Sequence, residues 1–289
     1  MAERIGVIGG GIAGLTCAFR LTQSGHEVEL FESSDQLGGL GTFFPYKNRF
    51  VDRFYHCIMP GDEHLLSLIR DLGLADQLYW KTTYMGMVYE HKHYPFNSAL
   101  DLLRFDALSL VSRLRLGAMS LLLPYLGDDQ QLDSTPTKAW LSKLYGAKLW
   151  DKFWAPMFAA KFGATAASLP SLYLKKRLGR EKNVGTRGYI KGGLHGLVEA
   201  LEKSIRAKNG RVHTSTSIES IEQHGDNIVA RFDGSEDLRF DRIISTVPLS
   251  ILAKIAGKNF DMSSLPKLDY HGVVNLLLFL DRTVQSYYW

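Results

Sequence analysis

Apolar and polar residues follow two different periods in the first fifty positions of the chain. Residues 4–8 form a short apolar run of the kind that builds a buried strand, and residues 12–24 carry apolar side chains at helical spacing. Gly25 ends that helix, and residues 27–32 alternate again as a second strand. The pattern therefore predicts a strand, a turn, a helix and a second strand, in this order.

The turn between the first strand and the helix contains three glycines at G-x-G-x-x-G spacing, Gly9, Gly11 and Gly14. Such a turn lets the backbone approach a pyrophosphate, and the helix start at Ile12 and Ala13 presents free N–H groups to it. Glu32 ends the second strand, where a carboxylate accepts hydrogen bonds from ribose hydroxyls and repels a 2′-phosphate. One alternative is a tight turn without a ligand, which does not explain the acid. The other is an export signal, which the density of glycines and the lack of a small-residue cleavage site argue against. An adenine dinucleotide other than NADP is predicted.

A pair of glycines further along the chain changes the expected dinucleotide from NAD to FAD. Gly38 and Gly39 follow Glu32 by six and seven residues, and Leu15 follows the third glycine of the turn. Together with the turn, these residues resemble the flavoprotein superfamily of amine oxidases, protoporphyrinogen oxidase, phytoene desaturases and UDP-galactopyranose mutase. The resemblance implies that this set holds FAD, and that a C-terminal segment with a Gly-Asp pair is missing from a truncated chain.

The same resemblance implies cofactor contacts at three further positions. Leu40 follows the glycine pair at a place where the superfamily often has Arg or Lys. The main chain around Ile218 would clasp the adenine, and Thr246, in a Thr-x-Pro run, would lie near the cofactor.

The fold implied is α/β, a Rossmann-like FAD-binding domain with a parallel sheet and a β-hairpin or β-meander, into which a mainly helical substrate domain is inserted. We expect the FAD-binding domain in residues 1–83 and 186–258, and the substrate domain in residues 84–185 and 259–289. Periodicity predicts a hairpin over 84–96 with its turn at 90–93, and helices over 62–72, 99–105, 106–125, 136–145, 147–154, 170–178 and 194–208. Strands are predicted over 211–221, 227–233, 237–240, 241–247 and 273–280.

The helix expected over residues 106–125 is apolar on most faces. Asp106 is its expected N-cap, as Thr135 is for the helix over 136–145. Arg113 and Arg115 leave an uncharged stretch too short to span a bilayer, which needs ~20 residues. The helix is then a buried part of the inserted domain, which is the interpretation we favour, or it lies on a membrane surface or lines an entry for a hydrophobic substrate.

Three side chains are candidates for positions near the flavin. His56 stands in a stretch that resembles the loop over the isoalloxazine ring, although it could instead satisfy a backbone carbonyl. Trp154 and Lys161 lie in stretches that resemble a segment of these flavoproteins. The resemblance implies that Trp154 forms part of a pocket wall and that Lys161 meets an anionic substrate or the flavin edge, unless Lys161 is a surface lysine. Cys57 could face the flavin or pack as a small apolar side chain.

Composition narrows the possible partners. The chain has 34 basic and 30 acidic residues, and the net charge of +4 is not gathered in one block, so nucleic acid is not expected. Its only two cysteines favour a reducing, cytoplasmic location, with membrane association left open, and they have no metal-ligand spacing. His91 and His93 fit a solvated turn better than a metal site. The sequence indicates no particular oligomeric state.

These features favour an FAD-dependent oxidoreductase in which flavin N5 accepts hydride from a small organic substrate. The apolar character of the inserted helical domain favours a hydrophobic substrate. One alternative is a sugar-nucleotide mutase that uses reduced flavin, for which Arg177 and Arg180 are the available phosphate-binding candidates. The other is a non-catalytic remnant of the fold.

Overall fold

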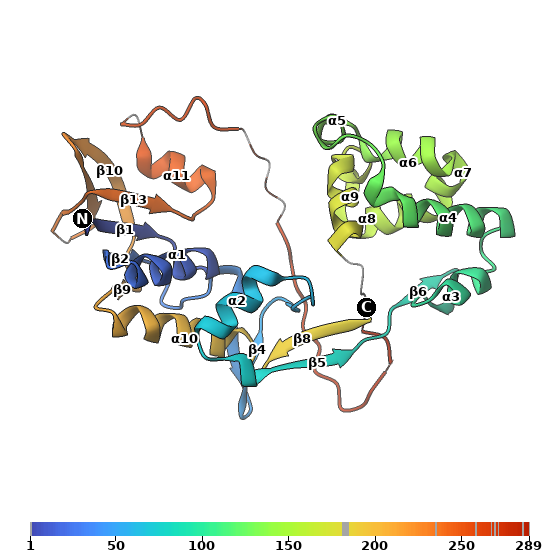
Figure 1. Ribbon diagram of the computed structural model, residues 1–289, viewed down its shortest axis with the longest axis horizontal. Helices are drawn as coiled ribbons and strands as arrows, with labels where there is room; N and C mark the ends of the chain where they lie inside the picture. Colours follow the sequence, from blue (N-terminus) through green and yellow to red (C-terminus); the bar gives the residue numbers. More distant parts are fainter. Residues whose placement is uncertain are drawn as a thin grey trace. The chain divides into compact units, whose positions relative to one another are not determined.

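The computed structural model describes residues 2–180, 185–234, 236–257, 259–266, 268, 270, 272–284 and 286–288 (Figure 1). The chain forms two compact units. Unit 1 comprises Met1–Ile58, Glu63–Tyr79 and Gly188–Leu280, and unit 2 comprises Met59–Asp62, Trp80–Arg187 and Asp281–Trp289. Unit 1 thus extends beyond residue 258, where the sequence analysis placed the end of the FAD-binding domain.

A four-stranded parallel sheet forms the centre of unit 1. Its strands are β1 (Arg4–Ile8), β2 (Glu27–Phe31), β9 (Arg211–His213) and β13 (Arg242–Ser245), in the order β13-β1-β2-β9. Helix α1 (Ile12–Gln23) connects β1 to β2, as a parallel pair requires. Because the strands run parallel, their carboxyl ends lie at one edge of the sheet, which confirms the predicted Rossmann-like architecture.

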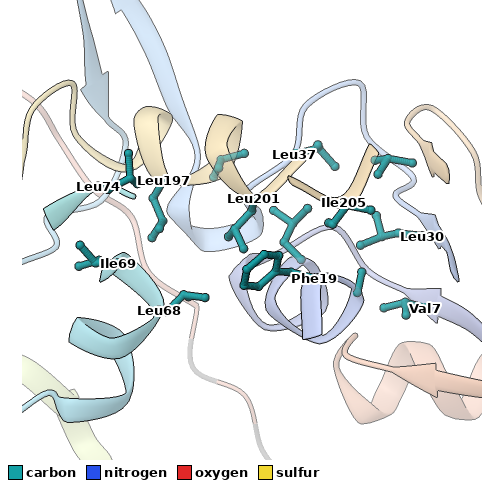
Figure 2. Packing of buried hydrophobic residues seen from close by; sticks show 14 of the residues in the cluster. Val7, Phe19, Leu30, Leu37, Leu68, Ile69, Leu74, Leu197, Leu201 and Ile205 are labelled. Carbon is teal, nitrogen blue, oxygen red and sulfur yellow. The ribbon is translucent and has the colours of Figure 1, made fainter. Parts of the chain in front are cut away.

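The two faces of this sheet are covered by different layers. Val7 and Leu30 pack in one cluster with α1 and with α10 (Leu194–Ala207), and Figure 2 shows Phe19 of α1 among Leu201 and Ile205 of α10. α2 (Glu63–Asp71) adds Leu68 and Ile69 to this cluster. The other face packs against the antiparallel sheet of β10 (Ile218–His224), β11 (Asn227–Phe232) and β12 (Leu238–Phe240), and against α11 (Leu249–Ala256).

Two predicted strands of unit 1 are wrong. Residues 211–221 do not form one strand, because Ser215 adopts a φ of 50° between β9 and β10 and its N–H donates to the Ser34 carbonyl at 2.8 Å. Residues 273–280 form no strand, since the described chain offers them no ladder partner. Instead, the Phe279 ring stacks on Tyr46 at 3.9 Å, beside the hairpin of β3 (Phe43–Tyr46) and β4 (Arg49–Asp52).

The predicted hairpin over residues 84–96 is confirmed as β6 (Gly86–Tyr89) and β7 (Lys92–Pro95), but its turn is shorter than expected. Glu90 and His91 form it, with φ values of 46° and 64°, and His93 lies in β7. The sequence analysis missed a further pair, β5 (Leu78–Thr82) with β8 (Thr186–Ile190).

Helices build the rest of unit 2. They are α3 (Ala99–Arg104), α4 (Leu110–Leu122), α5 (Asp129–Ser134), α6 (Thr137–Tyr145), α7 (Ala147–Leu149), α8 (Ala155–Phe162) and α9 (Ser171–Arg180), with a π-helical turn at Trp150–Trp154 between α7 and α8. None of the helices in the described part of the chain is both long and apolar enough to cross a bilayer.

Both caps that we predicted in this region are wrong. α4 begins after Ser109, whose hydroxyl accepts from the Ser112 N–H at 3.3 Å, while Asp106 accepts a hydrogen bond from the Tyr94 hydroxyl. The Thr135 hydroxyl donates back to the Gln131 carbonyl at 2.7 Å, at the end of α5, a helix that the sequence analysis missed. α4 is also not the buried helix we favoured, because Leu116 is its only buried residue.

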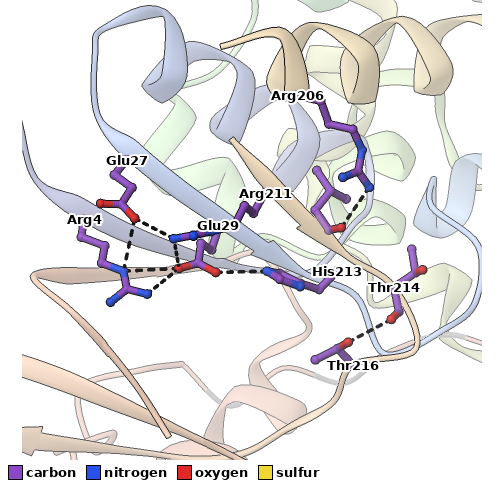
Figure 3. A network of polar contacts seen from close by, with 9 residues as sticks. Arg4, Glu27, Glu29, Arg206, Arg211, His213, Thr214 and Thr216 are labelled. Carbon is purple, nitrogen blue, oxygen red and sulfur yellow. Dashed lines mark hydrogen bonds and ion pairs between the residues drawn. The ribbon is translucent and has the colours of Figure 1, made fainter. Parts of the chain in front are cut away.

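A buried carboxylate joins β2 to β9 and to the start of the chain (Figure 3). The side chain of Glu29 is 3% exposed and accepts hydrogen bonds from Arg4 at 2.7 Å and Arg211 at 2.8 Å. Its second oxygen lies 3.1 Å from His213 Nε2. Burial alone would raise the pKa of Glu29, but the hydrogen bonds of Arg4 and His213 and the charge of Arg211 outweigh it and lower that pKa.

We expect Glu29→Gln to lower the free energy of unfolding by about 2 kcal/mol, less than for a fully buried pair because both arginines reach solvent. Glu27, on the same strand and in contact with the same arginines, is 54% exposed and provides the matched control. Glu27→Gln should cost about 0.5 kcal/mol. Urea unfolding at neutral pH measures both.

The pH dependence has a definite sign. Because folding lowers the pKa of Glu29, its stabilisation is complete above the ordinary glutamate pKa and is lost as pH falls through the folded-state value. The gap between wild type and Glu29→Gln should therefore close on acidification. Equal effects of the two variants at neutral pH would contradict this account.

Candidate dinucleotide-binding site

An open cavity of about 900 Å³ lies at the carboxyl edge of the parallel sheet, and all the residues that line it belong to unit 1. This edge is where open α/β sheets bind their ligands. Its lining includes most of the candidates predicted from the sequence, namely Gly9, Gly11, Ile12, Ala13, Glu32, Gly38, Gly39, Leu40, His56, Ile218 and Thr246. The structure therefore brings together residues from five distant segments of the chain.

Gly14, the third glycine of the turn, has a packing role instead. A Cβ atom on Gly14 would lie 1.9 Å from the Gly9 carbonyl oxygen and 2.9 Å from Thr246 Oγ1. Gly9 itself has a φ of 104°, which favours glycine, and its N–H donates to the Phe31 carbonyl at 2.8 Å. The first and third glycines thus let α1 start directly against the ends of β1 and β2.

Gly11 keeps the start of α1 open. It is the N-cap residue of α1, and no side chain caps the helix there. A Cβ atom on Gly11 would meet only Gly39 Cα, at 3.7 Å, among the described atoms within 4 Å. The N–H groups of the first turn, at Ile12 and Ala13, have no carbonyl within the helix to bond to. A helix start with free N–H groups suits an anion, and both residues line the cavity.

Glu32 lies at the mouth of this turn. One carboxylate oxygen accepts from the Gly10 N–H at 2.7 Å, and the other accepts from the Ser34 N–H at 2.9 Å and the Ser34 hydroxyl at 2.8 Å. Burial tends to raise the pKa of Glu32, but these hydrogen bonds prevail and lower it. The carboxylate is therefore ionised at neutral pH, as an acceptor for ribose hydroxyls must be.

The pair Gly38 and Gly39 closes one side of the cavity. The Gly38 N–H donates to the Gly10 carbonyl at 2.8 Å, and a Cβ atom on Gly39 would lie 2.9 Å from Gly11 Cα. Both glycines have positive φ, 119° and 57°, so the pair is needed for this close approach. Leu40 follows with its side chain 77% exposed at the cavity.

The segment after β9 forms the opposite wall. The Thr216 N–H donates to the Glu32 carbonyl at 2.9 Å, and this bond places Ser217 and Ile218 at the cavity. Thr246 Oγ1 donates to the Ile8 carbonyl at 3.0 Å, which fixes the loop after β13. The sequence analysis missed Phe31, Ser33, Thr216, Ser217 and Ile251. Ser33, Thr216 and Ser217 follow the carboxyl ends of the parallel strands β2 and β9, and this position was the available signal. Phe31 is the last residue of β2, and Ile251 lies in α11.

Asp52, His56 and Cys57 line another part of the cavity. Asp52 accepts from the N–H of Leu194, at the start of α10, at 3.1 Å. Burial raises the pKa of Asp52, against the opposing effects of that hydrogen bond and of His56. His56 Nδ1 donates to the Phe54 carbonyl at 2.9 Å, so His56 both satisfies a backbone carbonyl and reaches the cavity.

The remaining candidates belong to unit 2. Lys161 is an exposed residue of α8 with its Nζ 5.5 Å from the ring centre of Phe162. Trp154 is buried among helices, and its Nε1 has no partner in the described part of the chain. Arg177 donates to the Tyr173 hydroxyl at 3.0 Å, and the side chain of Arg180 lies outside what the structure describes. Within the described residues, no three His, Cys, Asp or Glu side chains form a metal site.

Comparison with known proteins points to one family. The family described as "Flavin containing amine oxidoreductase" matches residues 12–287. The 15-cis-phytoene desaturase of an Oncidium hybrid is 24% identical over 98% of this chain, and the mitochondrial protoporphyrinogen oxidase of Nicotiana tabacum is 24% identical over 93%. The chain spans only 53% and 63% of the lengths of these two relatives.

Solved structures with this fold include an oxidoreductase from Methanosarcina mazei, with a TM-score of 0.70 and 21% identity over 89% of this chain and 62% of that one. A Pyrococcus furiosus protein gives a TM-score of 0.66 and 24% identity, over 91% of this chain and 64% of its own. At these identities the likeness establishes the fold.

The different roles of Gly11 and Gly14 can be separated by mutation. Gly14→Ala should destabilise unit 1 by roughly 3 kcal/mol, because its Cβ would overlap the Gly9 carbonyl. Gly11→Ala should change the free energy of unfolding by less than about 1 kcal/mol, because Gly11 has a φ of −70° and free space around it. Thermal unfolding followed by circular dichroism measures both.

The Gly11→Ala variant should also bind a dinucleotide less tightly than wild type. The added methyl group of Gly11→Ala would occupy the place of the pyrophosphate and weaken dinucleotide binding on the order of tenfold or more. A stable Gly11→Ala protein that binds the dinucleotide like wild type would contradict the proposed place of the phosphates.

Proposed function

Because the chain belongs to the flavin-containing amine oxidoreductase family, we propose that it is an FAD-dependent oxidoreductase that takes hydride from an organic substrate. Family membership confirms the predicted flavoprotein resemblance and the FAD cofactor. The reaction and substrate of the whole protein are part of the proposal, since the chain spans about half to two thirds of its relatives.

The observation that carries the proposal is the arrangement of Glu32 beside the open start of α1. The Glu32 carboxylate suits the ribose hydroxyls, and the N–H groups of Ile12 and Ala13 suit the pyrophosphate. The cavity volume of about 900 Å³ lies within the usual range for cofactor sites, ~300–1,000 Å³. The residues present therefore fit the adenosine diphosphate half of FAD.

The residues of the cavity would have separate roles in holding FAD. Glu32 would orient the ribose and repel a 2′-phosphate, and the first turn of α1 would neutralise the pyrophosphate charge. When bound, FAD supplies the hydride acceptor at N5 of its ring. Asp52 and His56 line the cavity and belong to the stretch that resembles the loop over that ring, and with Cys57 they would limit access of water.

We also propose a hydrophobic substrate. Several relatives are named for carotenoid substrates, among them 15-cis-phytoene desaturase of Oncidium and zeta-carotene desaturase of Zea mays. A reducing, cytoplasmic location stays a prediction that rests on the two free cysteines, Cys17 and Cys57.

FAD titration of the purified full chain, followed by quenching of flavin fluorescence, tests the proposal. Glu32→Gln should weaken FAD binding about 10- to 100-fold, because a hydrogen bond to a charged group is worth ~1.5–3 kcal/mol. Glu219→Gln is the matched control, since Glu219 is exposed and lies outside the cavity lining. It should bind FAD like wild type.

NADP should compete with FAD much less well than ADP does, because Glu32 is ionised and close to the expected 2′ position. No quenching by FAD in a correctly folded chain would favour the non-catalytic remnant and reject the oxidoreductase. Equal loss of binding in the Glu32 and Glu219 variants would reject the role of Glu32 alone.

A further inference from the structure

Helix α4 of unit 2 exposes its apolar side. Leu110, Val111, Leu114, Leu121, Leu122 and Tyr125, which we call the α4 stripe, are all exposed, and Val111, Leu121 and Tyr125 are 76%, 77% and 75% exposed. They recur at spacings of three, four and seven residues, so they lie along one side of the helix and its last turn. A helix of a globular unit normally buries such a stripe.

Polar contacts hold the opposite side of α4 against unit 2. Arg113 Nε donates to the Leu108 carbonyl at 2.8 Å, and its guanidinium also bonds the Leu103 carbonyl. Ser120 Oγ lies 3.1 Å from the Tyr145 hydroxyl. Because Leu116 packs on this same side, rotation of α4 to bury its stripe would break these contacts.

The charges within α4 and its last turn all have one sign, and the first acidic residues after the stripe are Asp128 and Asp129 at the start of α5. Residues 110–126 contain Arg113 and Arg115 and no acidic residue. Arg113 points inward, whereas Arg115 is exposed, with its Nε donating to the Leu144 carbonyl at 3.0 Å. The partner of the stripe must therefore be apolar and must offer negative charge at its surface.

We propose that the α4 stripe docks unit 2 on a bilayer that contains anionic phospholipids. Leucine side chains would enter the boundary of the acyl chains, Arg115 would meet lipid phosphates, and Tyr125 would lie at the headgroup level. With 13 residues, α4 is long enough to lie in the interface and too short to span the bilayer.

A second copy of the chain fits the stripe less well. A two-fold contact centred on α4 would bring the Arg115 side chains of both copies into one interface, where residues 110–126 offer no acid to pair with them. Phospholipid headgroups supply that negative charge. The proposal is independent of flavin binding, which takes place in unit 1.

Co-sedimentation of the full chain with vesicles tests the proposal. The chain should bind vesicles of phosphatidylcholine with phosphatidylglycerol and should bind pure phosphatidylcholine at least about 5-fold more weakly, with added salt removing the difference. The double variant Leu114→Gln, Leu121→Gln should lose on the order of tenfold or more in binding to the anionic vesicles.

Val274→Gln with Leu276→Gln is the matched control, since these two side chains are 99% and 77% exposed in unit 1. This variant should bind vesicles like wild type, and unchanged melting should show that both variants fold. Equal loss of binding in the two variants would overturn the proposal, because any exposed apolar residue would then serve. Absence of vesicle binding, or sedimentation velocity in which the α4 variant alone turns a dimer into a monomer, would overturn it in favour of another partner.

Discussion

The hydrogen bond from the Gly10 N–H to the Glu32 carboxylate, 2.7 Å long, ties the end of β2 to the turn after β1. Parallel pairing aligns Ile8 with Phe31, so Glu32 is the first residue beyond the sheet and faces the turn. The Glu32 carbonyl then accepts from Thr216, and the Gly10 carbonyl accepts from Gly38. These bonds gather four chain segments around one carboxylate, and the cavity exists because they meet there.

Much of this arrangement could be predicted from the sequence because local chemistry determines it. The spacing of Gly9, Gly11 and Gly14 leaves few conformations other than a tight strand-to-helix turn, and the packing of Gly14 on Gly9 shows why. Glu32 could be found for the same reason, whereas the role of the pair Gly38–Gly39 came from the flavoprotein resemblance. The flavoprotein resemblance then supplied Ile218 and Thr246, which no local pattern would have chosen.

The elements that could not be predicted depend on partners distant in the sequence. Residues 273–280 have strong strand propensity, but propensity does not supply a neighbouring strand, and Phe279 packs on Tyr46 instead. Asp106 suits a helix cap equally well, yet the hydroxyl of Tyr94 competes for its carboxylate. In α4, periodicity reveals an apolar stripe without revealing which side faces the protein, and the contacts of Arg113 and Ser120 decide that question.

Amide hydrogen exchange of the full chain with and without FAD tests the central claim most directly. The first-turn amides of α1, at Ile12 and Ala13, have no carbonyl partner within the helix and should exchange fast in the free protein. Bound pyrophosphate should slow both amides strongly, while exposed residues of unit 2 keep their rates. FAD binding that leaves Ile12 and Ala13 unprotected would contradict the assignment of this turn as the phosphate site.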